Sequence, residues 1–516
     1  MEKIHLNKEP FPNAYLYNDK NQVEGEVEAS LDTNIALLEQ IFEDCGDIVK
    51  QKFLAFSDIS VYVVYVDGLA KVELVEDFVL RPLKCADKQE GQEVKGEQRK
   101  KLFQEKLDLV DISWKATMDE AVLEILSGNT LLFIDGVSEA IMISSKGFPT
   151  RGVAEVESEK TIRGSKDAFN ESMRTGTALL RRRIRDGRFK VKQVFLGERS
   201  RTNVAICYMD GLVRKEWLKE VEKRLNQYEY DAIYDSGMLE QLMEPEWNSP
   251  FPQFQHTERP DKAASAVLEG RVVIVVDNSP DVLILPATLN TFFQASDDYY
   301  CRFEVALFAR ILRYAAAVLA IGLPGLYLAV IGFHTEILPV ELVLTIAEAR
   351  RHVPFPVVVE VLLMELEFEL LREAGIRLPG QMGNTIGVVG GLIVGQAAVE
   401  AGLVSTIVVI VVALTAIASF SIPNEAFTSA FRLLKFFLIL VCAFWGIYGF
   451  FLGMLVVMLH LASLESLSIP YLFPAVSAAK PDYDDSKDFI LKMPINRMEK
   501  RPYFTDAGNR RRLRSK

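Results

Sequence analysis

The chain has 516 residues, enough for two or more domains, and carries a formal net charge of −12. Because a nucleic-acid-binding protein needs a basic face, this acidic balance argues against DNA or RNA as a partner. The five cysteines are scattered without a CxxC or His-paired spacing, so we predict neither a zinc site nor a disulfide framework, and a reducing compartment fits best. The first ten residues contain no apolar run, so we also expect no signal peptide.

Polar and apolar residues are divided unevenly along the chain. Residues 1–300 are mixed and charged, 305–465 are mostly apolar, and 480–516 are polar and basic. This division predicts an α/β N-terminal cytoplasmic domain followed by an α-helical transmembrane bundle. By the positive-inside rule, the basic C-terminal tail is expected in the cytoplasm as well.

One local pattern occurs twice in the N-terminal part. A β-branched and aromatic run, an Asp-Gly pair and a helix follow one another over residues 60–83 and again over 203–225. A third Asp-Gly pair, within residues 129–144, joins two strands as in a hairpin. The repetition predicts two related α/β units. Each Asp-Gly pair is expected to form a turn that needs positive φ, with a direct ligand role as the alternative.

These patterns divide the chain into six parts. They are a polar tail at 1–30, a first α/β unit at 31–128 with a polar loop at 87–101, a second α/β unit at 129–245, a connector with a short helix and strands at 246–304, the transmembrane bundle at 305–470, and a basic cytoplasmic tail at 471–516.

Three consecutive arginines, Arg181, Arg182 and Arg183, end a predicted helix in the second unit. Such a run is usually a solvated or salt-bridged face. The alternative is a docking surface for lipid headgroups or for an acidic neighbouring subunit.

The apolar part contains several candidate membrane spans. Because both ends of the chain are expected in the cytoplasm, the number of spans should be even. We predict four, at residues 308–333, about 385–401, 404–420 and 433–463. Pro324 is expected to kink the first span, and Arg310 and Arg313 near its start to reach lipid headgroups.

An acidic helix is predicted at 354–373, where Glu360, Glu365, Glu367 and Glu369 interrupt an apolar sequence. These carboxylates fall on two sides of a helix, which a lipid-exposed helix would not tolerate. The helix is therefore expected either to pack in the bundle or lie at the interface, or to line an ion pathway.

A stripe of glycines follows, with Gly383, Gly387, Gly391 and Gly395 at every fourth position. This spacing clears one helix face and lets another helix approach closely. Gln396 and Glu400 continue the segment, and together with the glycines they are candidates for helix packing or for a pore lining.

Long stretches of the chain resemble the A subunits of the GerA family of spore germination receptors of spore-forming Firmicutes, over about residues 31–475. The stretches that carry the resemblance are IRGSKDAFNESMRTGTALLRRRI (162–184), TERPDKAASAVLEGRVVIVVDNSPDVLILP (257–286), DDYYCRFEV (297–305), LREAGIRLPGQMGNTIGVVGGLIVGQAAVEAGLVS (371–405) and SIPNEAFTSAFRLLKFF (421–437). A related branch, stage V sporulation protein AF, has the same fold. The GQAAVEAG run is more similar to the receptor A subunits.

The resemblance implies a multi-pass subunit of the spore inner membrane that acts with a transporter-like B subunit and a lipoprotein C subunit. Such complexes respond to small nutrients, and the A subunit is expected to form a homo-oligomeric ion channel in contact with membrane lipid. The alternatives are a non-conducting scaffold that clusters receptors and a small-molecule transporter. No Walker A, GxSxG, HExxH or nucleotide-binding glycine motif occurs in the sequence, so we expect no enzyme, catalytic residue, metal site or cofactor.

Overall fold

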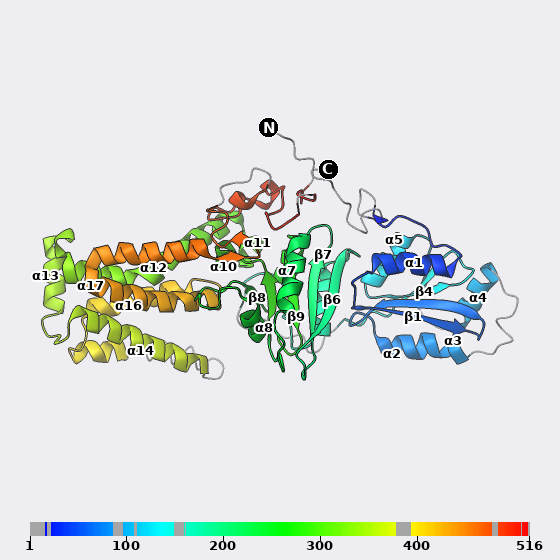
Figure 1. The fold of residues 1–516 in the computed structure, drawn as a ribbon, viewed down its shortest axis with the longest axis horizontal. Helices are drawn as coiled ribbons and strands as arrows, with labels where there is room; N and C mark the ends of the chain where they lie inside the picture. Colours follow the sequence, from blue (N-terminus) through cyan, green and yellow to red (C-terminus); the bar gives the residue numbers. More distant parts are fainter. Residues whose placement is uncertain are drawn as a thin grey trace, which may run out of the picture.

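The structure is a computed structural model. It describes residues 16–17, 22–85, 96–107, 111–148, 159, 161–377, 394–476, 483–506 and 508–513. Two units built on β-sheets and a bundle of helices follow one another along the long axis of the molecule (Figure 1).

The first unit is a five-stranded antiparallel sheet with helices on both faces. Its strands, in the order β1-β2-β4-β5-β3, are β1 (Ile48–Ala55), β2 (Ile59–Val66), β3 (Ile112–Lys115), β4 (Thr130–Ile134) and β5 (Ala140–Ile143). One face is covered by α1 (Leu31–Ile41) and α5 (Met118–Leu126), the other by α2 (Val72–Val75), η2 (Glu76–Leu80), α3 (Arg81–Cys85) and α4 (Glu97–Lys106). Alternate residues of β2 enter the two cores, which explains why nearly all of this strand is apolar.

The second unit has the same strand order, β6-β7-β9-β10-β8. Its strands are β6 (Phe189–Leu196), β7 (Thr202–Met209), β8 (Gln255–Thr257), β9 (Val272–Val276) and β10 (Val282–Leu285). Helices α6 (Met173–Arg183) and α9 (Pro260–Leu268) pack on one face, and α7 (Lys215–Leu225) and α8 (Ser236–Met243) on the other. The shared order supports the prediction of two related units.

The expected boundaries between these units were wrong. Strands β4 and β5 pair within the first sheet, although we placed residues 129–144 in the second unit. Much of the expected connector at 246–304 supplies β8, α9, β9 and β10 to the second sheet. In each sheet the third strand in sequence, β3 or β8, lies at an edge and pairs with neither the strand before it nor the strand after it in the chain.

The Asp-Gly pairs form the expected turns. Gly68, Gly136 and Gly211 have φ of 82°, 79° and 80°. Gly68 follows β2 and Gly211 follows β7, at the corresponding place in each sheet. A side chain at these positions would force an L-residue into a left-handed conformation, which favours glycine.

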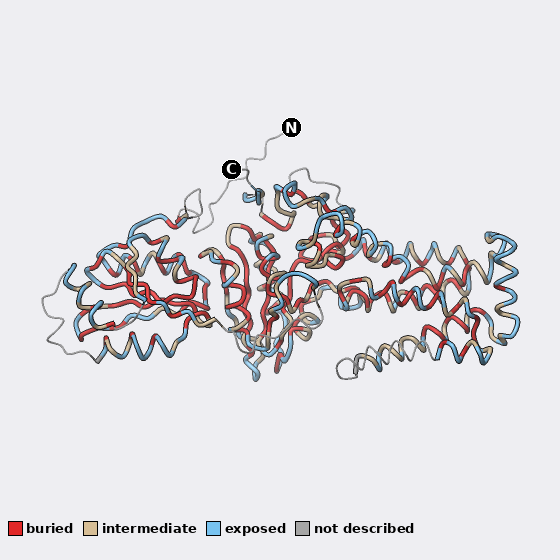
Figure 2. The backbone as a smooth tube through the Cα atoms, turned by 180° about the vertical axis from the view of Figure 1, so that it is seen from behind, coloured by how far each residue is buried: buried red, intermediate tan, exposed pale blue. Residues whose placement is uncertain are grey.

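The chain then enters the helical bundle. Its elements are α10 (Leu289–Phe293), α11 (Asp297–Tyr300), α12 (Phe303–Phe333), η4 (Thr335–Ile337), α13 (Val340–Ala349), α14 (Val357–Arg377), a helical stretch at 394–400, α16 (Thr406–Phe420), α17 (Glu425–Ser463) and the two short strands β11 (Glu465–Ser466) and β12 (Ile469–Pro470). By length and composition, α12 and α17 could each cross a membrane, and α16 is a shorter apolar helix. Several aromatic side chains of the bundle are exposed, including Phe444 and Tyr448 of α17. Figure 2 shows stretches of exposed residues along the helices of the bundle. Apolar exposure of this extent is typical of a surface that meets lipid or another subunit.

Helix α17 is a helical hairpin. Its backbone leaves the helical conformation at Gly446, where φ is 57° and ψ is −135°. Phe427 and His460, near its two ends, both contact the ring of Phe251, with centroids 5.8 and 6.1 Å away. In a straight helix these two residues would be about 50 Å apart at 1.5 Å per residue. The expectation of a single span at 433–463 was therefore wrong. Pro324, by contrast, lies inside the continuous helix α12, and the kink expected there stays a prediction.

Replacing Gly446 by alanine is expected to destabilise the hairpin by about 1–3 kcal/mol, because the positive φ strains any L-residue. An added Cβ would also lie 3.0 Å from the Cβ of Phe333. Gly332→Ala is the matched control, because a Cβ there meets no atom within 4 Å. Thermal unfolding of the detergent-solubilised protein, followed by circular dichroism, measures the difference. Equal melting temperatures for the two variants would contradict the role of Gly446.

Two arginines near the start of α12 anchor the bundle to the rest of the protein. Arg310 is fully buried and pairs with Asp298 at 3.0 Å and with Asp488 of the C-terminal segment at 2.6 Å. Arg313 pairs with Asp298 at 2.7 Å. The expectation that these arginines reach lipid headgroups was wrong, because nearby carboxylates neutralise them inside the protein.

The C-terminal segment packs against the second unit, near the start of α12. Asp506 N donates to Leu212 O at 2.8 Å, Thr505 Oγ1 donates to Glu269 O at 2.8 Å, and Asn290 Nδ2 donates to Asp488 O at 2.9 Å. Two short 3₁₀ helices, η5 (Asp485–Lys487) and η6 (Ile495–Arg497), lie in this segment. The expected basic tail is thus a docked element that joins the second unit to the bundle.

Asp485 of this segment is expected to make the stability of the protein depend on pH. Burial raises its pKa from 3.8 to about 7, although the backbone N–H of Tyr503 donates to the carboxylate at 3.0 Å. The folded state therefore holds a proton that the unfolded state releases, and stability falls as the pH rises from about 4 to 7. Asp485→Asn is expected to reduce this fall, as measured by denaturation midpoints at several pH values. If stability fell with pH equally in wild type and Asp485→Asn, Asp485 would not be the cause of the fall.

Candidate functional site in the helical bundle

Five charged side chains gather between α14 and α17, next to α16, in otherwise apolar surroundings. We call them the bundle charge cluster, and they are Glu365, Glu369, Arg372, Arg432 and Lys435. Ionisable groups within apolar helices are costly to bury and mark functional sites in membrane proteins.

A buried ion pair lies at the centre of the bundle charge cluster. The side chains of Glu365 on α14 and Lys435 on α17 are only 1% and 6% exposed. Lys435 Nζ donates to Glu365 Oε2, and it lies 3.3 Å from Glu369 Oε1. Glu365 Oε1 has no hydrogen-bond partner among the described residues. The pair joins α14 to α17 because each charge would be strongly unfavourable there alone.

Two arginines complete the cluster. Arg432 pairs with Glu369 at 3.5 Å. Arg372 donates to Ser419 Oγ of α16 at 2.9 Å and lies 4.7 Å from the ring centroid of Phe420. The cluster therefore contains three cations and two carboxylates, and it links three helices through polar contacts.

Glu360 lies apart from this cluster. It is fully buried, pairs with Arg350 at 3.0 Å, and accepts a hydrogen bond from the backbone N–H of Ser405 at 3.1 Å. Ser405 is the N-cap of α16, so the carboxylate lies where the helix dipole favours negative charge.

The predicted acidic helix thus packs in the bundle. Glu360, Glu365 and Glu369 are all neutralised by cations, whereas Glu367 is half-buried and has no ion pair among the described residues. Arg432 and Lys435 were not among the site residues predicted from the sequence. The usable signal was their spacing of three residues in an apolar helix, which places both on one face.

The glycine stripe lies mostly outside the described residues, which include Gly395 but not Gly383, Gly387 or Gly391. A Cβ added to Gly395 would meet Val409 Cγ1 at 3.6 Å, an ordinary contact. Gln396 donates to Glu400 Oε1 at 3.0 Å on the exposed surface of the same helix. The packing and pore roles of this segment remain predictions.

Two of the three consecutive arginines form ion pairs within the chain, whereas a docking role of the exposed Arg182 stays a prediction. Arg181 is fully buried between the two units, and its Nε and Nη2 donate to Asp47 at 2.9 and 2.8 Å. Arg183 pairs with Asp167 at 2.6 Å. Arg182 is exposed and lies over the ring of Phe148. The salt-bridged alternative was therefore correct for Arg181 and Arg183.

A polar cavity of about 480 Å³ lies beside this interface. Its lining includes Asp47, Asp67 and Gln193, together with Arg174 and Asp277. Arg174 pairs with Asp67 at 2.8 Å across the two units. The cavity is thus bordered by charges of both signs.

The comparison with protein families identifies the chain. The family model described as "Bacillus/Clostridium GerA spore germination protein" matches residues 36–504. The chain belongs to the GerA family. Among its relatives in Bacillus subtilis (strain 168), spore germination protein A1 is 39% identical over 467 residues, which cover 90% of this chain and 94% of that protein. Spore germination protein KA is 37% identical over 478 residues, covering 92% and 87%.

Two further similarities were found to this GerA-family chain. The uncharacterized membrane protein YfkQ of B. subtilis (strain 168) is 38% identical over 485 residues, covering 94% of this chain and 93% of that protein. The crystal structure of the N-terminal domain of the A subunit of the Bacillus megaterium spore germinant receptor GerK3 is 25% identical, with a TM-score of 0.41. It covers 51% of this chain and 98% of that one.

Proposed function

We propose that this GerA-family chain is the membrane subunit of a nutrient-responsive spore germination receptor and forms an ion channel that partner subunits gate. The observation that carries the proposal is the bundle charge cluster, which places paired charges inside apolar helices attached to a large α/β part. Rings of such carboxylates in an oligomer would favour cations.

The bundle suits a membrane position in the spore inner membrane. Helix α12 starts beside the second unit, and the hairpin α17 returns to the same end of the bundle, where His460 contacts Phe251. The bundle therefore begins and ends on one side, as an even number of crossings requires. The exposed apolar side chains of α12, α16 and α17 would face lipid or the neighbouring copies of a homo-oligomer.

Gating requires two arrangements of the bundle whose balance a partner can shift. The ion pairs between α14 and α17 hold one arrangement. A transporter-like B subunit in its nutrient-bound state, assembled with a lipoprotein C subunit, would favour the other.

A conductance measurement tests this proposal directly. Purified oligomer in a planar bilayer, with its partner subunits and nutrient, is expected to conduct cations. Gly391→Leu, in the glycine stripe, is expected to leave assembly intact and abolish the current. A wild-type complex that passes no current in any of these conditions would favour a scaffold that clusters receptors.

The cavity between the two α/β units supports a second candidate function, the binding of a small polar nutrient by this chain itself. Charged side chains of both signs border a space of about 480 Å³. Isothermal titration of the full chain with candidate nutrients, compared between wild type and Arg174→Gln, tests it. Binding that is absent, or unaffected by the substitution, would exclude this role.

A further inference from the structure

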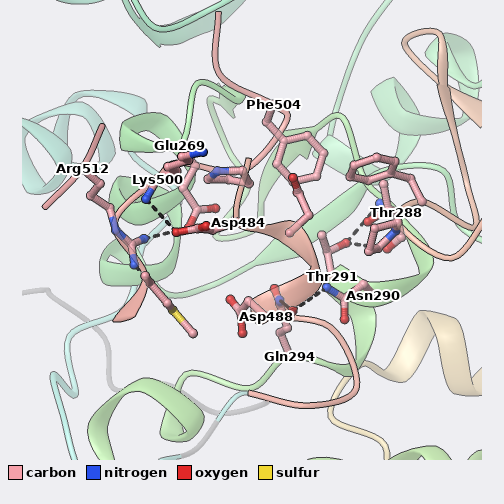
Figure 3. A pocket seen from close by; sticks show the side chains of 15 residues that line it. Glu269, Thr288, Asn290, Thr291, Gln294, Asp484, Asp488, Lys500, Phe504 and Arg512 are labelled. Carbon is pink, nitrogen blue, oxygen red and sulfur yellow. Dashed lines mark hydrogen bonds and ion pairs between the residues drawn. The ribbon is translucent and has the colours of Figure 1, made fainter. Parts of the chain in front are cut away.

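A second cavity, of about 190 Å³, lies where three segments meet, namely the second unit, the α10–α11 linker and the C-terminal segment. Arg271 and Glu269 line it from the second unit, Gln294 and Tyr299 from the linker, and Arg512 from the C-terminal segment. It adjoins the space in Figure 3, because Glu269, Gln294 and Arg512 line both.

Arg271 is a buried cation without a direct ion pair, although the charge of Glu269 acts on it from a longer distance. It is only 4% exposed, yet no carboxylate oxygen of the described residues lies within 4.0 Å of its guanidinium group. Its Nε donates to Pro286 O at 2.9 Å and its Nη2 to Gln255 Oε1 at 3.1 Å, and both acceptors are uncharged. The amide of Gln255 is held in this orientation because its Nε2 donates to Thr291 O at 2.9 Å. Arg271 Nη1 has no acceptor among the described residues.

The other deeply buried arginines each make a direct ion pair with a carboxylate. Arg181 pairs with Asp47 at 2.8 Å, Arg259 with Asp261 at 2.7 Å, and Arg310 with Asp298 at 3.0 Å. Desolvating a guanidinium ion is unfavourable unless an anion compensates for the lost water. Among the deeply buried arginines that the structure describes, Arg271 therefore lacks the direct carboxylate contact that the other three make.

Arg512, from the C-terminal segment, is a second cation in the lining and is only loosely paired. Arg512 Nη1 lies 3.8 Å from Glu269 Oε1, beyond hydrogen-bond distance. Figure 3 shows Arg512, Lys500, Glu269 and Asp484 on the same side of the cavity. Burial raises the pKa of Glu269 to about 6. A small further rise of this pKa, caused by a nearby anion, would make the carboxyl group neutral.

We propose that this cavity binds a small oxyanion, a carboxylate or phosphate group, with Arg271 as its principal ligand and Arg512 as the second. The planar guanidinium group matches both anions through paired N–H donors. A bound anion would tie the C-terminal segment to the second unit, immediately before α11 leads into α12. The site does not depend on whether the bundle conducts ions.

Isothermal titration calorimetry of the full chain in a phosphate-free detergent, with inorganic phosphate and with acetate, tests this site. Wild type is expected to bind at least one of them saturably, and Arg271→Gln to bind at least about 10-fold more weakly. Arg512→Gln, on the C-terminal segment, is expected to weaken binding several-fold. Arg199→Gln is the matched control, because this arginine is 82% exposed on the same unit and pairs with Asp231 far from the cavity lining; it should bind as wild type does.

Two outcomes would contradict the proposed anion site. One is that wild type binds neither anion, and the other is that wild type, Arg271→Gln and Arg512→Gln bind with equal affinity. If thermal unfolding shows that Arg271→Gln does not fold, the affinity of Arg512→Gln decides whether the cavity binds the anion.

A repeat in phosphatidylglycerol nanodiscs identifies the source of the anion. Added phosphate that binds in detergent but not in nanodiscs indicates a lipid headgroup, and equal binding in both indicates a soluble anion.

Discussion

Lys435→Met is expected to lower the stability of the helical bundle by about 3–5 kcal/mol, the cost typical of breaking a buried ion pair. The substitution leaves Glu365 buried on α14 without the cation that pairs with it, whereas Glu369 keeps Arg432 at 3.5 Å. Methionine fills a similar volume, so lost packing contributes little. Chemical denaturation of the detergent-solubilised protein, followed by circular dichroism, measures the change.

The double variant Glu365→Leu/Lys435→Met is the control for this prediction. Removing both charges takes away the desolvation cost together with the attraction, so most of the stability should return. A single variant as stable as wild type would show that this pair does not hold α14 against α17. Under the proposed channel function, the single variant should also conduct without nutrient, because the closed packing loses its main polar link.

Arg181→Met is expected to have a comparable effect at the junction of the two α/β units, again about 3–5 kcal/mol. Arg181 makes two hydrogen bonds to Asp47, and its Nη1 donates to Phe189 O at 2.9 Å. The substitution strands a carboxylate that is 2% exposed. The same denaturation experiment should show a lower midpoint, with the two units separating before either sheet unfolds.

The neighbouring Arg182 provides a control one residue away. It is exposed and makes a cation–π contact with Phe148 at 5.1 Å. Such contacts at exposed sites contribute about 0.5–1 kcal/mol, so Arg182→Met should cost no more than that. If both substitutions had the same small effect, the buried pair would not be what joins the units.

Local chemistry along the chain was enough to predict several features. Positive φ at Gly68 and Gly211 follows from Asp-Gly pairs after apolar strands. The α/β class, the duplication and the long apolar helices follow from periodicity and composition, because residues that share a face repeat at short, regular intervals. The charges within 354–373 likewise excluded a lipid-exposed helix.

The tertiary structure alone decided which of these segments became partners. Periodicity reports which side of a strand is buried but not which strand lies beside it, so β4 and β5 were assigned to the wrong sheet. The turn at Gly446 could not be read from an apolar run long enough for one tilted span, because only contacts between residues far apart, such as His460 with Phe251, reveal it. Arg181 with Asp47, and Lys435 with Glu365, are separated by 134 and 70 positions. A charged residue shows that it needs a partner, but only the folded chain determines which residue supplies it.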